Sequence, residues 1–355
     1  MSHYQRVGLP WGGSIATDVT DCATSKEVME KAGLNFEVKK CELVARMPIS
    51  LNGDNRVNET MGDFARDGMI YRDCPNAFAT YRTDKNIPLG LVKSKYEVVQ
   101  NIDAFKFFDD AIGPGKAVWQ TAGNFGYGHR IFVSAKLPVE TRVGDDKIDN
   151  YLLFSNSHDG SMSVNIMFTP VRVWCFNMLN SAKHSADSFI RLRHTSTVRD
   201  RIQMGAQVLA AACEHAIHSQ ELYNSLATMK MNDRQVMDYL ANLVLTDKEL
   251  EALNLFDKDN GIKKLMYKDY LTMERTGIST RKANKITAMF EYYQDGIGQK
   301  SIVGTAWGAY NAVTGYYANV DNMRGEKRLD SLLYGGANKV MLEGLNTVEM
   351  FAQAS

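Results

Sequence analysis

The clearest pattern of hydrophobic and polar positions lies in the middle of the chain. Between residues 161 and 168 the two kinds of residue alternate, which is typical of a strand with one buried face. An apolar run at residues 151–155 precedes it, and the intervening residues 156–160 end in Asp-Gly, which favours a tight turn. These features predict a β-hairpin. Pro170 is expected to end the second strand, and the next apolar run predicts a third strand or a bend leading into a helix.

Similar runs place the other predicted strands in the first half of the chain. Residues 78–82 and 89–92 flank a polar turn and indicate a second hairpin. Two segments are expected to be irregular, a polar excursion at residues 52–73 and a charged loop at residues 138–150. The remaining predicted strands are at residues 36–48, 117–122 and 127–137.

Two short helices are predicted among these strands. The sequence from Thr24 to Glu27 fits a capping box, and Gly33 is a suitable stop for the helix that follows. Residues 102–112 carry apolar positions at helical spacing, and Asn101 is the expected cap.

After Asn180 the spacing of apolar positions becomes helical. Asn232 and Thr246 are expected helix caps. The predicted helical segments are at residues 181–228, 229–244, 279–293, 302–318 and 338–351.

Strands followed by helices, rather than alternating with them, indicate an α+β fold. We predict an antiparallel sheet core of β-β-β-α type followed by a mostly helical C-terminal half. The predicted division is an N-terminal segment at residues 1–75 with a short helix, a strand and the polar excursion, the sheet core at residues 76–182, and a helical region at residues 183–355.

Composition narrows the possible functions. The 355 residues include 41 Lys and Arg against 41 Asp and Glu, so any nucleic-acid contact must come from a local patch. The five cysteines are scattered without a C-x-x-C pair, which favours a reducing compartment and argues against a zinc ribbon. No signal peptide or membrane span is apparent, so we expect a cytoplasmic protein, and no metal or cofactor is predicted.

Motifs with a chemical meaning are few. His158 and Asp159 could form a metal or general-base pair, but their setting favours a hairpin turn, because one His and one Asp side by side do not converge on a metal. The Gly-rich segment at residues 123–128 precedes a strand instead of a helix, so we interpret it as a turn and not as a phosphate loop. Cys175 could be a nucleophile or a packed thiol, and the pair His215 and His218 could share a ligand or be solvated.

Basic residues are more numerous than the candidate catalytic residues, and they indicate possible nucleic-acid binding. Residues 183–201 hold five Lys and Arg against two Asp, a local charge of +3, and Tyr127 with Arg130 places an aromatic ring beside a guanidinium group. Cations beside stacking surfaces suit single-stranded nucleic acid, although a solvated basic face has the same composition. The candidate nucleic-acid-binding residues are Tyr127, Arg130, Arg172, Arg191, Arg193 and Arg199.

Several motifs carry a resemblance to a known family. They include YLLFSNSHDGS at residues 151–161, TPVRVWCFN at 169–177, GTAWGAYNAVT at 304–314 and RLDS at 328–331. With LGLVKSKYEVVQN at residues 89–101, they resemble the phage/plasmid-like proteins classified as a domain of unknown function. The similarity spans about residues 11–334. Departures are the residues after Trp11, where relatives tend to carry His, and the excursion at residues 52–73.

The order of the predicted elements is similar to the β-β-β-α core of single-strand annealing proteins of the RecT, Redβ and Erf kind. That resemblance implies ATP-independent binding and annealing of single-stranded DNA by a homo-oligomeric ring or filament, with a host or phage replication protein as a further partner. We therefore expect a single-stranded DNA binding and annealing protein of phage or plasmid recombination and replication, rather than an enzyme, with no preference for base sequence.

Two other classes remain open from the sequence. One is a non-catalytic phage protein that assembles with itself or with a host factor and does not contact nucleic acid. The other is a metal-dependent nuclease or hydrolase that uses His129, His158 and Asp159.

Overall fold

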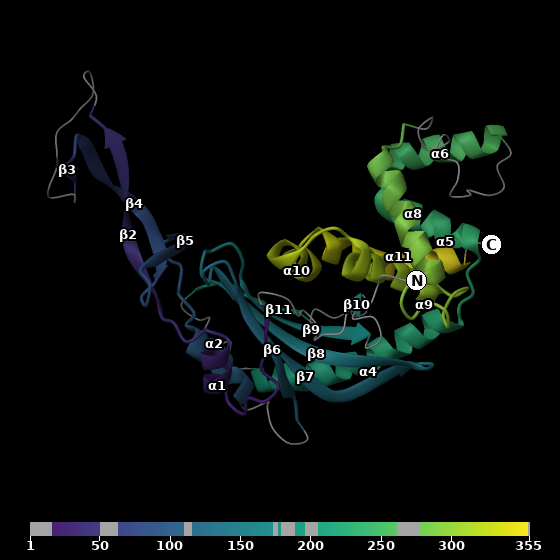
Figure 1. The fold of residues 1–355 in the computed structure, drawn as a ribbon, viewed down its shortest axis with the longest axis horizontal. Coiled ribbons are helices and arrows are strands. Elements are labelled where there is room, and N and C mark those ends of the chain that lie inside the picture. Colours follow the sequence, from purple (N-terminus) through teal and green to yellow (C-terminus); the bar gives the residue numbers. More distant parts are fainter. Residues whose placement is uncertain are drawn as a thin grey trace.

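The computed structural model describes residues 16–49, 63–109, 116–172, 177–178, 189–195, 205–260 and 277–353. Strands fill the first half of the chain and helices dominate the second, which confirms the predicted α+β class (Figure 1). An antiparallel sheet lies at the centre of the molecule. A strand arm projects from one end, and most of the C-terminal helices gather at the other.

The central sheet has seven strands in the described residues, and its middle is a meander of consecutive strands. In spatial order they are β1 (Ala16–Asp18), β6 (Val118–Phe125), β7 (Arg130–Val143), β8 (Asp146–Ser157) and β9 (Val164–Arg172). Both β10 (Asn177–Met178) and β11 (Phe189–Leu192) pair with β9. The predicted hairpin around residues 156–160 is therefore confirmed as the β8–β9 connection.

The arm is a separate four-stranded sheet. Its long strands β2 (Val38–Pro48) and β4 (Met69–Arg82) pair with each other, and β3 (Phe64–Arg66) and β5 (Ile87–Lys93) both pair with β4. The predicted second hairpin is thus confirmed as β4 and β5. The prediction of an irregular excursion is wrong from residue 64 onward, because those residues are strand.

The arm is joined to the central sheet at the β8–β9 turn. The hydroxyl of Thr80 donates to the carbonyl oxygen of His158 at 2.5 Å, and that of Tyr96 donates to the carbonyl oxygen of Ser157 at 2.6 Å. A Cβ atom at Gly90 would lie 2.4 Å from the Cα atom of Asp159. The contact therefore depends on a glycine at this position of β5.

The described helices agree with most of the sequence signals. Thr24 caps α1 (Ser25–Lys31) by accepting from the backbone N–H of Glu27, and Asn232 forms a capping box with Gln235 at α5 (Asp233–Val244). Gly33 takes the left-handed φ of +66° expected of a helix stop. The other helices are α2 (Asn101–Asp109), α4 (Gly205–Thr228), α6 (Asp247–Asn260), α8 (Thr280–Asp295), α9 (Ala306–Gly315), the π-helix η3 (Tyr316–Val320), α10 (Gly325–Leu333) and α11 (Gly336–Gln353).

Two hydrophobic cores lie on opposite faces of the central sheet. Alternate residues of each strand enter different cores, so that Phe132 and Leu153 face the C-terminal helices while Val133 and Phe154 face α1 and α2. Helix α4 contributes to both cores. All ten residues of α9 are buried, as expected of a helix that is packed on every side.

Three predictions about local structure are wrong for identifiable reasons. Pro170 lies within β9 and does not end it. It lies opposite Asn150 of β8, and on the other edge neither the described β10, which pairs at Val171 and Arg172, nor β11, which pairs only as far as Met167, needs a hydrogen bond from it. Residues 189–192, expected to be helical, form β11 because their backbone pairs antiparallel with residues 164–167 of β9. Asn101 begins α2, but its side chain bonds outside the helix, to the carbonyl oxygen of Leu34 and to His158.

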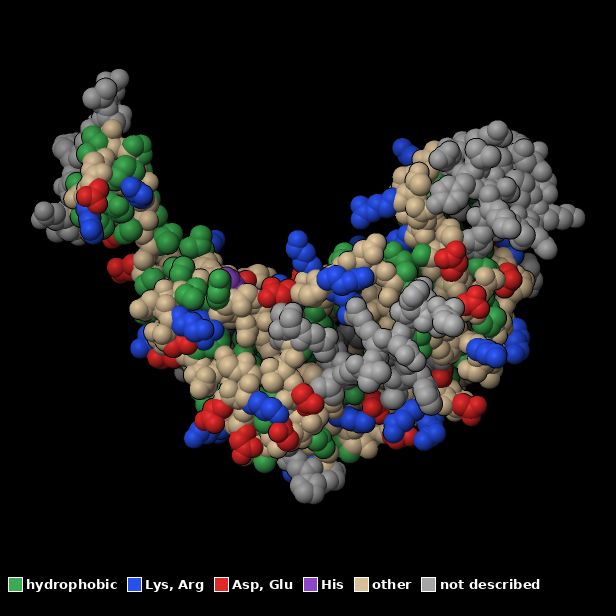
Figure 2. All heavy atoms as spheres, viewed as in Figure 1, with side chains coloured by type: hydrophobic (Ala, Val, Ile, Leu, Met, Phe, Trp, Pro, Cys, Tyr) green, Lys and Arg blue, Asp and Glu red, His purple; other side chains and the backbone are tan. Residues whose placement is uncertain are grey.

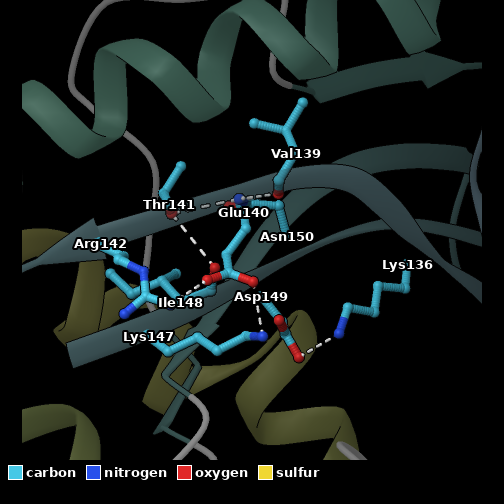
Figure 3. A network of polar contacts seen from close by, with 9 residues as sticks. All are labelled: Lys136, Val139, Glu140, Thr141, Arg142, Lys147, Ile148, Asp149 and Asn150. Atoms are coloured by element: carbon cyan, nitrogen blue, oxygen red, sulfur yellow. Dashed lines mark hydrogen bonds and ion pairs between the residues drawn. The ribbon is translucent and has the colours of Figure 1, made fainter. Parts of the chain in front are cut away.

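The predicted charged loop at residues 138–150 is also wrong, because β7 and β8 continue through it as a hairpin. The pairing slips between Lys136 and Glu140, where β7 has two more residues than β8. Figure 3 shows how this bulge is held. The side-chain amide of Asn150 donates to the carbonyl oxygen of Val139 at 2.9 Å and to the hydroxyl of Thr141 at 3.3 Å.

The charged residues of the hairpin pair with one another (Figure 3). Across the two strands, Lys136 pairs with Asp149 at 2.7 Å and Glu140 pairs with Lys147 at 2.7 Å. Within β7, Glu140 also pairs with Arg142 at 2.8 Å. A run of charges that suggested a loop is therefore the cross-strand pairing of a hairpin.

Replacing Asn150 is expected to destabilise the protein. Asn150 is 1% exposed, so Asn150→Ala leaves the carbonyl oxygen of Val139 without its donor at a cost of about 1–3 kcal/mol. The matched control is Arg142→Ala in the exposed part of the same hairpin, which should cost about 0–1 kcal/mol. Urea unfolding measures both. Equal losses in the two variants would mean that Asn150 does not hold the bulge.

Candidate functional site

A polar cleft lies where the end of the central sheet meets α10 and α11. Its volume is about 510 Å³, and we call it the sheet-end cleft. Its floor comes from the start of β7, from the residues that lead into β9, and from β11. Its wall comes from the end of α10 and the start of α11. The lining residues are Arg130, Ser161, Met162, Ser163, Asn165, Arg191, Asp330, Leu333, Tyr334, Gly335 and Asn338.

The Gly-rich turn between β6 and β7 places Arg130 at this cleft. Gly126 and Gly128 have φ angles of +59° and +106°, and the carbonyl oxygen of Phe125 accepts from the N–H groups of Gly128 and His129. A Cβ atom at Gly128 would lie 2.6 Å from the ring of Phe36. The prediction that this segment is a turn leading into a strand is confirmed.

Arg130 is held between an aromatic ring and a carboxylate. Its guanidinium carbon lies 4.7 Å from the ring centroid of Phe125, and its Nη1 atom pairs with Asp330 on α10. The side chain of Arg130 is 23% exposed and that of Asp330 is 39% exposed, so the pair lies at the cleft surface. This ion pair joins the sheet to the helical half, and it partly offsets the positive charge expected here.

Arg191 reaches the same cleft from the edge of the sheet. Residues 189–192 pair with Met167 to Val164 of β9, and in this register Arg191 lies opposite Asn165. Arg191 is exposed, and both residues line the cleft. Two of the six predicted nucleic-acid-binding residues are thus brought together from positions 61 apart in the chain.

Of the other four predicted residues, only Tyr127 and Arg193 have described side chains, and neither lines this cleft. Tyr127 is 62% exposed on the β6–β7 turn, where its carbonyl oxygen accepts from Arg82 at 2.9 Å. Arg193 is exposed directly after β11. The backbone of Arg172 is in β9, but its side chain lies outside the described residues, as does all of Arg199.

The residues of the nuclease hypothesis do not form a metal site. His158 is fully buried, and its Nε2 atom lies 2.8 Å from the side-chain oxygen of Asn101. Asp159 accepts from the N–H of Ser161, and His129 accepts from the N–H of Tyr127. Among the residues that the structure describes, no three His, Cys, Asp or Glu side chains are grouped to hold a metal ion. His158 acts in the turn, where its N–H donates to the carbonyl oxygen of His129 at 2.6 Å.

The other residues with a possible chemical role do not form a common site in the described structure either. His215 lies beside the ring of Phe168, whereas His218 lies 3.7 Å from Glu221, so the two imidazoles have different neighbours. Cys175 lies outside the described residues.

The sequence analysis missed the wall of the cleft, although one signal pointed to it. The motif at residues 328–331 was noted only for a resemblance, yet each of its polar residues makes a contact at this junction. Arg328 donates to the carbonyl oxygen of Ala318 in η3, Asp330 pairs with Arg130, and Ser331 accepts from the N–H of Ala337 in α11. Through these contacts the motif connects α10 to the central sheet, to the π-helix and to α11.

This geometry defines the protein as an α+β protein with a cation-containing cleft at the end of its central sheet. Residues 88–333 match the family described as "Domain of unknown function (DUF932)", and the chain belongs to that family. This range holds most of the central sheet and the cleft residues as far as Leu333. No significant match was found among the curated proteins or among the solved structures. None of the described helices is both long enough and apolar enough to cross a bilayer.

We expect the stability of the protein to decrease below pH 6.5 because of His158. Burial lowers the pKa of His158 from the ordinary 6.5 to about 3, so between these values the unfolded chain binds a proton that the folded chain does not. Stability then falls by about 1.4 kcal/mol for each pH unit in this window.

The control is His158→Gln, which retains an amide able to bond Asn101 and has no titrating imidazole. Urea unfolding of both proteins at pH 7, 6 and 5 should show a steeper loss for the wild type, by about 2 kcal/mol over the interval from pH 6.5 to 5. Parallel curves would mean that the imidazole is not kept neutral by the fold.

Proposed function

We propose that this protein binds single-stranded nucleic acid, with the sheet-end cleft contacting the phosphate backbone. The observation that carries the proposal is that Arg130 and Arg191, from different strands, line one cleft. Guanidinium groups suit phosphate because their fixed fork of N–H donors matches its oxygens. Arg193, exposed directly after β11, extends the positive character along the sheet edge.

The shape of the molecule supports a strand-like ligand. Figure 2 shows a hollow edge between the arm and the helical end, with Lys and Arg side chains along it over α10 and beside α8. An unpaired strand lying along this edge would pass the sheet-end cleft. Contacts of this kind read the backbone, so no preference for base sequence follows from them.

Asp330 gives the proposal a distinctive electrostatic consequence. Its carboxylate pairs with Arg130, so a phosphate must compete with it for that guanidinium. Arg191 approaches the same cleft from the sheet edge, and its guanidinium group carries a positive charge. Arg191 therefore contributes attraction, and Asp330 contributes repulsion toward a polyanion.

Substitutions of these two residues should change affinity in opposite directions. Arg191→Gln is expected to weaken binding of a fluorescent oligo(dT) about tenfold at low salt. Asp330→Asn is expected to tighten it about threefold, the scale of one partly exposed charge interaction. Fluorescence anisotropy titrations measure both. The salt dependence of the Arg191→Gln variant should fall by about 0.7 in log–log slope, the value for one phosphate contact to a single strand.

Arg142→Gln is the matched control, because Arg142 is exposed on the same sheet and does not line the cleft. Its affinity should equal that of the wild type. Absence of binding at low salt, or equal affinities for the Arg191→Gln and Arg142→Gln variants, would refute the proposal.

Annealing and assembly extend this proposal. The support for this extension is the resemblance of the predicted element order to the β-β-β-α core of single-strand annealing proteins; in this chain β7, β8 and β9 are followed by β10, β11 and then α4. We infer a homo-oligomer that anneals complementary strands without ATP, in the cytoplasm of a cell carrying a phage or plasmid, alongside a host or phage replication protein. These elements rest on the resemblance and not on the cleft.

Annealing should be visible with two complementary oligonucleotides that carry a donor and an acceptor dye. The protein is expected to raise their pairing rate without ATP, while mass measurements with and without oligonucleotide report an assembly larger than one chain. Binding without any increase in the pairing rate would contradict annealing and leave the binding proposal intact.

The arm favours a second candidate, a non-catalytic protein that assembles with copies of itself. Five large apolar side chains in the arm or directly after its strand β2 are exposed by more than a third: Val44, Met47, Ile49, Phe64 and Leu91. The ring of Phe64 stacks on that of Tyr71 at 4.5 Å. Under this alternative the mass measurement shows an oligomer, and the anisotropy titration shows no binding even at low salt.

A further inference from the structure

A second cleft lies on the other side of the α10–α11 junction. It has a volume of about 1010 Å³ and is formed by α8, η3 and the start of α11. We call it the tyrosine cleft, after Tyr316 and Tyr317. Ser331, Gly336 and Ala337 line it, whereas the neighbouring Asp330, Gly335 and Asn338 line the sheet-end cleft. One short segment of chain therefore separates two clefts.

The two tyrosines are presented by an uncommon backbone. The π-helix η3 continues directly from α9, and its widened turn is closed by a hydrogen bond of 2.9 Å from the N–H of Asp321 to the carbonyl oxygen of Tyr316. Short π-helical turns are rare and often occur at functional sites. This turn places Tyr316 and Tyr317 next to each other, with ring centroids 5.2 Å apart.

Lys285 of α8 is held against these rings without a carboxylate partner. Its Nζ atom lies 2.6 Å from the hydroxyl oxygen of Tyr317 and 4.8 Å from the centroid of that ring. No described carboxylate lies within ion-pair distance of it. By contrast, Lys282 on the same helix pairs with Glu249 at 2.5 Å. Burial lowers the pKa of Lys285, as expected of a cation that is only partly compensated.

Arg281 adds a second positive charge to the same cleft. It lies one turn before Lys285 on α8, on the side of the helix that both residues share. The cleft also contains Asp321, whose carboxylate accepts from the N–H of Met323 at 3.0 Å. Two cations against one carboxylate leave a net charge of +1 among these three side chains.

We propose that the tyrosine cleft binds a phosphate group between Arg281 and Lys285. A phosphate has several acceptor oxygens and can accept from a guanidinium fork, from an ammonium group and from the side-chain amide of Asn284 together. The anion supplies the charge that the fold leaves uncompensated beside Lys285. The exposed part of the half-buried Tyr316 ring offers a surface for an attached base.

The phosphate can belong to a free nucleotide or to a polynucleotide strand. If it belongs to a strand, the inference rests on the proposed function, because the strand would continue from the sheet-end cleft past residues 330–338. If it belongs to a free nucleotide, the site acts independently of DNA binding. The two sources differ in which probe responds to a substitution at Lys285.

Calorimetric titration of the full chain with dTTP, and anisotropy titration with oligo(dT), test the site. Lys285→Met and Arg281→Gln are expected to weaken binding of at least one probe about tenfold. Lys285→Arg retains the charge and should preserve most of the affinity. The matched control is Lys282→Met, since Lys282 lies on the same helix and does not line the cleft. Thermal unfolding of each variant confirms that it folds.

The responding probe identifies the source of the phosphate. Loss of dTTP binding alone supports a free nucleotide, and loss of oligo(dT) binding supports a strand that spans both clefts. Arg191→Gln should leave dTTP binding unchanged, which separates failure of the proposed function from failure of this site. The inference is overturned if the wild type binds neither probe, or if Lys282→Met weakens binding as much as Lys285→Met does.

Discussion

The burial of both faces of the central sheet is the constraint on which the rest of the structure depends. In β7, β8 and β9, alternate side chains enter two different hydrophobic cores, one beneath α1 and α2 and the other beneath the C-terminal helices. Burying one large apolar side chain contributes about 1.5–3 kcal/mol, so the many such residues on each face hold the two halves of the chain on one sheet. Polar chemistry is then confined largely to strand ends, turns and edges. The sheet-end cleft lies at such an end, and the arm is attached at such a turn.

The α10–α11 junction positions residues that line both clefts. Arg328, Asp330 and Ser331 each bond a different element, which fixes the position of the junction relative to the sheet and to η3. The same segment forms a wall of both clefts. The two clefts differ in their electrostatics. Arg130 is ion-paired with a carboxylate in one, whereas in the other the described groups in direct contact with the Lys285 ammonium are a tyrosine hydroxyl and aromatic rings, and Asp321 lies farther away. The tyrosine cleft therefore has more positive charge available to a ligand than the sheet-end cleft has at Arg130.

Sequence patterns predicted the elements well where the local and tertiary signals agreed. The capping residues Thr24 and Asn232 act within one helical turn, so the sequence contains all that determines them. Predictions were wrong where a distant strand provided the deciding partner. Pro170 remains in a strand because of where β10 and β11 pair, and the charges at residues 140–149 pair across a hairpin instead of marking a loop. A one-dimensional pattern contains no information about such partners.

The sequence by itself determined the α+β class, the central hairpin, the Gly-rich turn before Arg130 and the presence of basic residues near residue 191. Only the tertiary structure decided that Arg130 and Arg191 share a cleft, that Asp330 opposes one of them, and that Lys285 lies against two tyrosines of a π-helix. The reason is physical. Periodicity and capping depend on neighbours within a few residues, whereas the charge balance of a cleft depends on side chains 61 to 200 positions apart that meet only when the two faces of the sheet are covered.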